Sequence, residues 1–131
     1  MSKIPPLIAI VDDEESICRA LKRLMLSAGL DVEAFTSGAG FFDFLKTKSP
    51  DCLVLDLHMP GMSGFDVQSQ LAQLGNKLPV VTITGHDSPE AQQRVMDAGA
   101  SAYLRKPVND HVLLEAIMAA IQSREDTQET D

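Results

Sequence analysis

Five short apolar runs alternate along the chain with stretches of helical spacing, and this alternation constrains the fold more than any other feature. Strands and helices that alternate in this way are typical of an α/β fold, in which helices cover both faces of a parallel sheet. The pattern therefore predicts a single (βα)5 domain. The runs are LIAIV (7–11), VEAF (32–35), CLVLD (52–56), PVVTIT (79–84) and AYLRK (102–106).

The apolar content of each run indicates where its strand lies in the sheet. The first, third and fourth runs are nearly continuous in apolar residues, as expected for central strands that are buried on both faces. The second run is short and partly polar, which suits an edge strand. Because the connections between parallel strands are almost always right-handed, few strand orders are possible. We therefore expect the flavodoxin-like strand order 2-1-3-4-5.

Several local signals predict where helices begin and end. Apolar residues recur at helical spacing over 17–28, and Gly29 follows as a stop signal. Ser88 and Pro89 fit the N-cap and the first position of a later helix. The segment 37–45 has two glycines where its helix would begin. Because glycine is unfavourable in helices, this segment is expected to have a frayed start.

Residues with chemical functions stand at the ends of four of the predicted strands. In a parallel sheet the carboxyl ends of all strands meet at one rim, where ligands of open α/β folds bind. These side chains are therefore expected to converge. They are Asp12 and Asp13 after the first run, Asp56 in the third, Thr84 with Gly85 at the fourth, and Lys106 with Pro107 at the fifth.

Three carboxylates at one rim, those of Asp12, Asp13 and Asp56, repel one another. At about 4 Å each pair costs roughly 1 kcal/mol in water and roughly 4 kcal/mol at a surface-like dielectric. A divalent cation offsets this cost, and Mg²⁺ favours a few carboxylates together with phosphate oxygens. With Lys106 as a second cation and Thr84 as a hydroxyl donor, the set predicts a small site for phosphoryl chemistry.

Each of these residues also has an ordinary structural interpretation. Asp12 and Asp13 fit a helix N-cap, where negative charge is favourable. A threonine at a strand end is commonly structural, and Lys-Pro is a common turn. A functional site is favoured because these residues stand at the carboxyl ends of four strands, and the strands of a parallel sheet all point the same way.

The motifs at these strand ends resemble the receiver domain of two-component response regulators. The resemblance covers roughly residues 7–122, and the wording of the last two motifs is similar to that of FixJ-type activators. The motifs are DD (12–13), DLHMPGMSG (56–64), ITG (83–85) and YLRKP (103–107).

The resemblance implies a role for each residue that would hold Mg²⁺. Asp56 matches the phosphoacceptor, which is itself a metal ligand. Asp13 matches the direct metal ligand, Asp12 the ligand that acts largely through water, and His58 the residue whose backbone carbonyl is the third protein ligand. The imidazoles of His58 and His86 are expected in surface loops.

The resemblance also implies which residues bind the phosphoryl group and respond to it. Thr84 and Lys106 match the pair that holds the phosphoryl oxygens. Tyr103 matches the aromatic residue that changes rotamer on activation, together with Thr84 as the other switch residue. Pro107 matches a position that follows a cis peptide bond. A histidine kinase or a histidine phosphotransfer protein is the implied donor, and pairing through the fourth helix, fifth strand and fifth helix the implied response.

Other functions remain open at this point. The chain could be a stand-alone phosphorelay receiver or the N-terminal receiver of a DNA-binding transcriptional regulator. An Asp-nucleophile phosphatase usually has a second acid where His58 stands, and a flavin or nucleotide binder would need a phosphate loop that this sequence lacks. A degenerate receiver that serves only as a scaffold would not need all the charged residues. We therefore expect a signalling domain rather than an enzyme.

The composition of the chain argues against some classes of partner and indicates where the folded domain ends. The 131 residues carry a net charge of -8, which argues against direct binding to nucleic acid or to an anionic membrane. Cys18 and Cys52 lie far apart in apolar stretches, so we expect buried thiols and a cytoplasmic location. The expected receiver domain is 1–123. Residues 124–131 are predicted to be an acidic disordered tail or the start of a linker.

Overall fold

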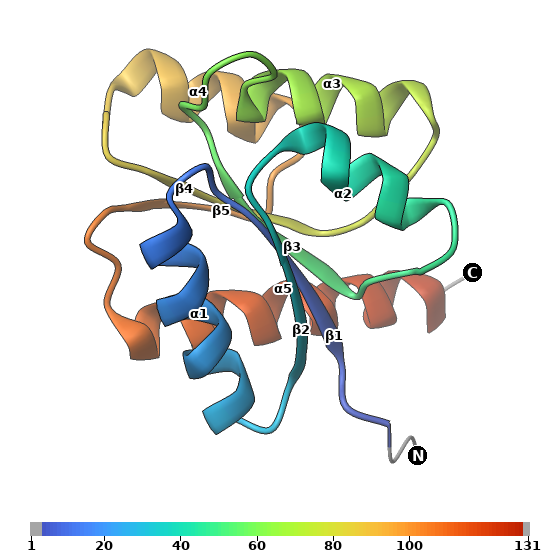
Figure 1. Ribbon diagram of the computed structural model, residues 1–131. Coiled ribbons are helices and arrows are strands. Elements are labelled where there is room, and N and C mark those ends of the chain that lie inside the picture. Colours follow the sequence, from blue (N-terminus) through green and yellow to red (C-terminus); the bar gives the residue numbers. More distant parts are fainter. Residues whose placement is uncertain (1–3, 130–131) are drawn as a thin grey trace.

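The computed structural model describes residues 4–129, which form one five-stranded sheet with helices on both faces (Figure 1). The strand order is β2-β1-β3-β4-β5, and every neighbouring pair is parallel. This confirms the predicted α/β class and the flavodoxin-like order. The strands are β1 (Leu7–Val11), β2 (Asp31–Phe35), β3 (Cys52–Asp56), β4 (Val80–Thr84) and β5 (Ala102–Arg105), and the helices are α1 (Glu15–Ser27), α2 (Gly38–Leu45), α3 (Gly64–Gln73), α4 (Pro89–Asp97) and α5 (Asp110–Glu129).

The core consists of two main layers, one on each face of the sheet. Helices α1 and α5 cover one face, and α2, α3 and α4 cover the other (Figure 1). Within β1, Ile8 and Ile10 pack toward α1 and α5, whereas Ala9 and Val11 pack toward α2 and α3. This alternation follows from the two-residue period of a strand. All residues of β3 are buried, as expected for a central strand.

Strand β2 lies at an edge of the sheet, as its polar composition predicts. Asp31 and Glu33 are exposed, whereas Val32 between them is buried. Charged side chains on an edge strand disfavour pairing with a strand of another molecule.

Most helix boundaries agree with the sequence signals. The Ser88 side chain accepts a hydrogen bond from the Ala91 N–H, and Pro89 is the first residue of α4. The predicted frayed start of α2 is wrong. Ser37 caps this helix by accepting from the Gly40 N–H at 3.2 Å, and Gly38 is buried where a Cβ atom would lie 2.5 Å from Met62 Sδ.

Residues 124–129 are helical, whereas the sequence predicts that a disordered tail or a linker begins at residue 124. Helix α5 continues to Glu129, since no Gly or Pro interrupts it and Gln122 Nε2 donates to Asp126 Oδ1 one turn further on at 3.0 Å. Residues 130–131 of the predicted tail lie outside the described residues. Within residues 4–129, no helix combines the length and the apolar character needed to cross a bilayer.

Both cysteines are free and buried, as their apolar surroundings predict. Burial raises the pKa of the Cys52 thiol to about 12. Cys18 Sγ donates to the backbone carbonyl of Asp12 at 3.2 Å. These thiols therefore belong to the core.

Candidate functional site

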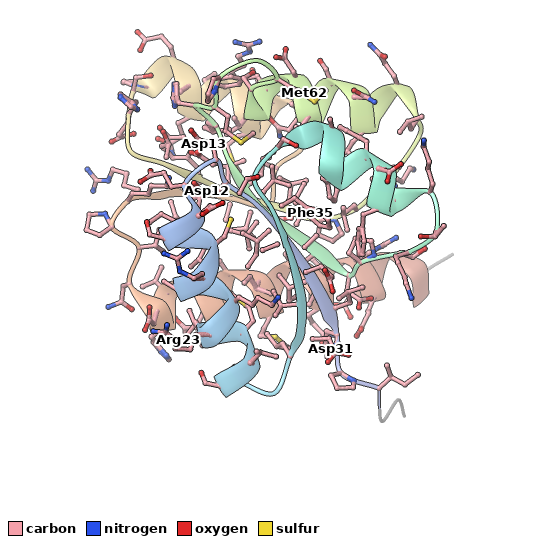
Figure 2. All side chains as sticks on the ribbon, in the orientation of Figure 1. Asp12, Asp13, Arg23, Asp31, Phe35 and Met62 are labelled. Carbon is pink, nitrogen blue, oxygen red and sulfur yellow. The ribbon has the colours of Figure 1, made fainter. Side chains whose placement is uncertain are left out.

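The carboxyl ends of the four strands β1, β3, β4 and β5 meet at one rim of the sheet. The register places Asp56 of β3 beside Ile83 of β4, and Thr84 beside Arg105 of β5. Asp12 and Asp13 follow β1 directly, in the loop that leads to α1 (Figure 2).

Three carboxylates share this rim. Asp12, Asp13 and Asp56 each offer an oxygen, and these oxygens lie within 4.8 Å of one another. Asp12 and Asp56 are buried, with 0% and 3% of their surface exposed, whereas Asp13 is exposed. Like charges this close in a buried site are costly unless a cation is near.

An N-cap role for Asp12 or Asp13 would explain only one contact in the structure. Asp12 Oδ1 accepts from the Glu14 N–H at 2.9 Å. The N-cap residue of α1 is Glu14 itself, which makes no side-chain cap hydrogen bond. Neither aspartate is the N-cap, and Asp13 is exposed.

Lys106 is the cation of the rim. Its Nζ lies 2.8 Å from Asp12 Oδ2, 3.5 Å from Asp56 Oδ1 and 3.6 Å from Glu14 Oε1. Burial works against the charged ammonium, but the hydrogen bond and charge of Asp12, followed by Asp56 and Glu14, raise the pKa of Lys106 above its ordinary value. The peptide bond from Lys106 to Pro107 is cis.

The Asp56 carboxyl has an altered affinity for protons. Burial is the main cause and the charge of Asp12 adds to it, so that the pKa of Asp56 rises to about 6, although Lys106 acts in the opposite direction. A cation that approaches this carboxyl would favour its charged form and so lower its pKa.

The turn after β3 fixes the position of Asp56. Ser63 begins α3 with a capping box, in which its hydroxyl accepts from the Asp66 N–H and the Asp66 carboxylate accepts from the Ser63 N–H. The next residue, Gly64, donates its N–H to the Leu57 carbonyl at 3.0 Å. A Cβ atom at Gly64 would lie 2.7 Å from Leu57 Cα and closer still to the Asp56 carbonyl oxygen, so only glycine allows this approach.

Thr84 lies fully buried at the end of β4, and its hydroxyl has two partners. Thr84 Oγ1 accepts from the His86 N–H at 2.9 Å and lies 3.1 Å from His58 Nδ1. Burial, then the neighbouring His86 and Lys106, lower the pKa of His58. The sequence did not predict the contact of this imidazole, because 26 residues separate the two side chains and no local signal joins them.

Tyr103 of β5 lies further from the carboxylates, against the start of α4. Its hydroxyl donates to Asp87 Oδ1 at 2.8 Å and accepts from the Ser88 N–H at 3.2 Å. Its ring packs on the small cluster that Leu57 and Val95 form. Tyr103 thus joins β5 to the start of α4, within the region where the family resemblance implies a response to phosphorylation.

The residues at the rim fit a hard divalent cation. Their donor atoms are carboxylate oxygens, the type that Mg²⁺ prefers. Asp12 Oδ2 is buried without a hydrogen bond of regular geometry, and its near neighbour is the Lys106 ammonium. Asp12, Asp13 and Asp56 could therefore hold such an ion between them.

Comparison with known proteins agrees with this geometry. The family model "Response regulator receiver domain" matches residues 8–118. The response regulator protein TodT of Pseudomonas putida is 39% identical over 122 residues, which are 93% of this chain and 54% of TodT. The DNA-binding transcriptional regulator NtrC of Klebsiella pneumoniae is 37% identical over 120 residues, 92% of this chain and 26% of NtrC.

Solved structures give the same result. The crystal structure of FixJ-N superposes with a TM-score of 0.84 at 34% identity and covers 93% of this chain and 96% of that one. The chain spans about half the length of TodT and about a quarter of that of NtrC. The resemblance found in the motifs is confirmed, and the chain belongs to the response regulator receiver domain family.

Proposed function

We propose that the chain is a signalling switch that accepts a phosphoryl group on Asp56. The observation that carries the proposal is a buried carboxylate close to two others, with an ammonium 3.5 Å away, at the rim of a parallel sheet. An oxygen of Asp56 attacks the phosphorus of a phosphohistidine on a histidine kinase or a phosphotransfer protein. The P–N bond breaks, the imidazole leaves with the electron pair and takes up a proton, and an acyl phosphate forms.

The other residues of the rim have supporting roles in this proposal. Asp12, Asp13, Asp56 and the backbone carbonyl of His58 would hold Mg²⁺. When bound, Mg²⁺ neutralises charge on the transferred phosphoryl group. The ammonium of Lys106 and the Thr84 hydroxyl bind the phosphoryl oxygens.

Phosphate uptake tests this proposal directly. The protein is incubated with acetyl phosphate and Mg²⁺, and its intact mass is measured. We expect a gain of one phosphoryl group that EDTA and Asp56→Asn both abolish. Asp31→Asn, at the opposite end of the sheet, is the matched control and should leave uptake unchanged. If Asp56→Asn takes up phosphate at the wild-type rate, the assignment of the phosphoacceptor is wrong.

The output of the switch is proposed to be the surface formed by α4, β5 and α5. Tyr103 joins β5 to the start of α4, and exposed apolar side chains lie on α4 and α5 at Met96, Val112 and Met118. Phosphorylation would favour pairing of two copies through this surface. The relatives TodT and NtrC are regulators by name, and NtrC binds DNA. Their names support control of transcription as the output.

Pairing is tested by light scattering with and without beryllofluoride, a tetrahedral analogue of the phosphoryl group. We expect the mass to rise toward that of a dimer when the analogue and Mg²⁺ are present. Val112→Asp should prevent the rise, whereas Leu26→Asp, at an exposed apolar position on α1, should not. An unchanged mass at high protein concentration would contradict pairing but leave the phosphoacceptor assignment standing.

A further inference from the structure

The Thr84 hydroxyl oxygen has two polar neighbours before any phosphoryl group arrives. Its oxygen accepts a hydrogen bond from the His86 N–H at 2.9 Å. A hydroxyl has a single proton to donate. His58 Nδ1 lies 3.1 Å from the same oxygen, and an unprotonated ring nitrogen there accepts that proton. In the tautomer with an unprotonated Nδ1, the proton that a phosphoryl oxygen would need is already donated to His58.

Two other rings lie near the His58 ring. The Phe65 ring of α3 meets it edge to face, with centroids 6.0 Å apart and planes at 87°. The centroid of the His86 ring lies 4.9 Å from that of the His58 ring. The guanidinium of Arg94 from α4 covers Phe65 at 4.1 Å. The imidazole is thus oriented by α3 and, through Phe65, by α4.

We propose that the imidazole of His58 has an unprotonated Nδ1 and is a positioning residue, which holds the Thr84 hydroxyl in the unphosphorylated protein and competes with the phosphoryl group for its proton. The inference rests on the proposed function and adds a residue whose side chain that function does not use. Because the proton cannot be donated to both acceptors, phosphorylation of Asp56 must break the His58–Thr84 hydrogen bond. The bond therefore favours the unphosphorylated state.

Replacement of His58 by Phe removes the acceptor but keeps an aromatic ring against Phe65. A neutral, partly exposed hydrogen bond of this kind has a small net value, so His58→Phe should bind beryllofluoride with Mg²⁺ about three- to fivefold more tightly than the wild type. Asn places a polar atom close to the position of Nδ1, so His58→Asn should restore affinity close to that of the wild type. Both affinities can be followed through the fluorescence of Tyr103, the single tyrosine in a chain without tryptophan.

A double-mutant cycle shows whether His58 acts through Thr84. In a Thr84→Val background, His58→Phe should change the beryllofluoride affinity by less than about 1.5-fold, because the shared proton is gone. His111→Phe, on the exposed surface of α5, is the control for the loss of a histidine and should leave affinity unchanged. An equal effect of His58→Phe in both backgrounds, or equal affinities of His58→Phe and His58→Asn, overturns the proposal.

A second measurement needs no phosphoryl chemistry. In metal-free protein, the ¹⁵N resonance of His58 Nδ1 should have the shift of an unprotonated, hydrogen-bonded nitrogen, and Thr84→Val should move it while the ring of His111 stays unchanged. If Thr84→Val leaves the Nδ1 resonance where it was, the hydrogen bond is refuted. A wild-type protein that binds no beryllofluoride overturns the proposed function, and the nitrogen spectrum then decides on the hydrogen bond alone.

Discussion

Asp56→Asn should stabilise the metal-free protein at neutral pH. The folded state holds the Asp56 carboxylate in a buried position beside Asp12, and this raises its pKa to about 6 from 3.8. Asn has nearly the same shape and no charge, so it removes the burial cost and the repulsion. The residue proposed as the phosphoacceptor is in this sense a source of instability.

The size of the effect follows from the shift of the pKa. A rise of about two units, at about 1.4 kcal/mol for each unit, destabilises the folded state by about 3 kcal/mol when the carboxyl is fully ionised. For a domain of this length, this corresponds to about 10 °C in Tm. The loss of the contact with Lys106 subtracts from the gain, so we expect Asp56→Asn to stabilise by about 2–3 kcal/mol at pH 7.5.

The free energy of unfolding should depend on pH in the opposite sense to that of a protein whose carboxylate is stabilised by a salt bridge. Because the folded pKa lies above the unfolded one, the folded state holds more protons between about pH 4 and pH 6, and stability falls as the pH rises through this range. The advantage of Asp56→Asn over the wild type should therefore shrink by about 2 kcal/mol between pH 7.5 and pH 4.5. Urea unfolding followed by circular dichroism in EDTA measures both values.

Two controls separate this account from a general effect of charge. Asp31→Asn removes an exposed carboxylate and should change the free energy of unfolding by less than about 0.5 kcal/mol at either pH. Mg²⁺ at ten times its Kd should stabilise the wild type by about 1.4 kcal/mol and Asp56→Asn by less. If Asp56→Asn is no more stable than the wild type at pH 7.5, or if its advantage does not depend on pH, the electrostatic account of the site is refuted.

Three other substitutions test how the rim is built. Lys106→Met leaves the buried carboxylates of Asp12 and Asp56 without their cation, so it should lower the free energy of unfolding in EDTA by about 3 kcal/mol, and Mg²⁺ should restore part of the loss. Gly64→Ala forces a Cβ into the backbone after β3 and should cost about 1–3 kcal/mol in urea unfolding, together with slower phosphate uptake on Asp56. Ser63→Ala removes the capping box of α3 and should cost about 1 kcal/mol, measured in the same way.

Gly85 provides the matched control for Gly64. It lies on the same rim, but a Cβ there would meet only Lys106 Cδ, at 4.0 Å. Gly85→Ala should therefore leave the free energy of unfolding nearly unchanged. Equal losses for Gly64→Ala and Gly85→Ala would contradict the close approach of α3 to the end of β3.

The sequence predicted the sheet and the meeting of its strand ends because both depend on local patterns. The nearly continuous apolar runs of β1, β3 and β4 are visible in the sequence, and parallel strands with helical crossovers bring their carboxyl ends to one rim. Thus Asp12, Asp56 and Lys106 could be assigned to one site before any coordinates were known.

The features that the sequence did not predict depend on contacts between distant segments. The His58–Thr84 hydrogen bond joins two loops, and nothing in either loop indicates the direction of the imidazole. Helix propensity alone makes Gly38 unfavourable at the start of α2, whereas its buried contact with Met62 explains why glycine stands there. The extension of α5 past residue 124 shows a related limit, since polar composition indicates neither a helix nor a disordered tail by itself.

Both groups that would hold a phosphoryl oxygen already have partners in the resting protein. Lys106 pairs with Asp12 at 2.8 Å, and Thr84 is bonded to His58 at 3.1 Å. Phosphorylation would therefore exchange hydrogen bonds rather than add them. Since a hydrogen bond has a net value of about 1 kcal/mol, two exchanges would bias the switch by no more than about 2 kcal/mol. A shift from 1:99 to 99:1 needs roughly 5.5 kcal/mol. The remainder must come from contacts that only the active state makes, and pairing through α4, β5 and α5 would provide them. On this proposal the phosphorylated monomer would be only partly switched, and pairing with a second copy would complete the transition.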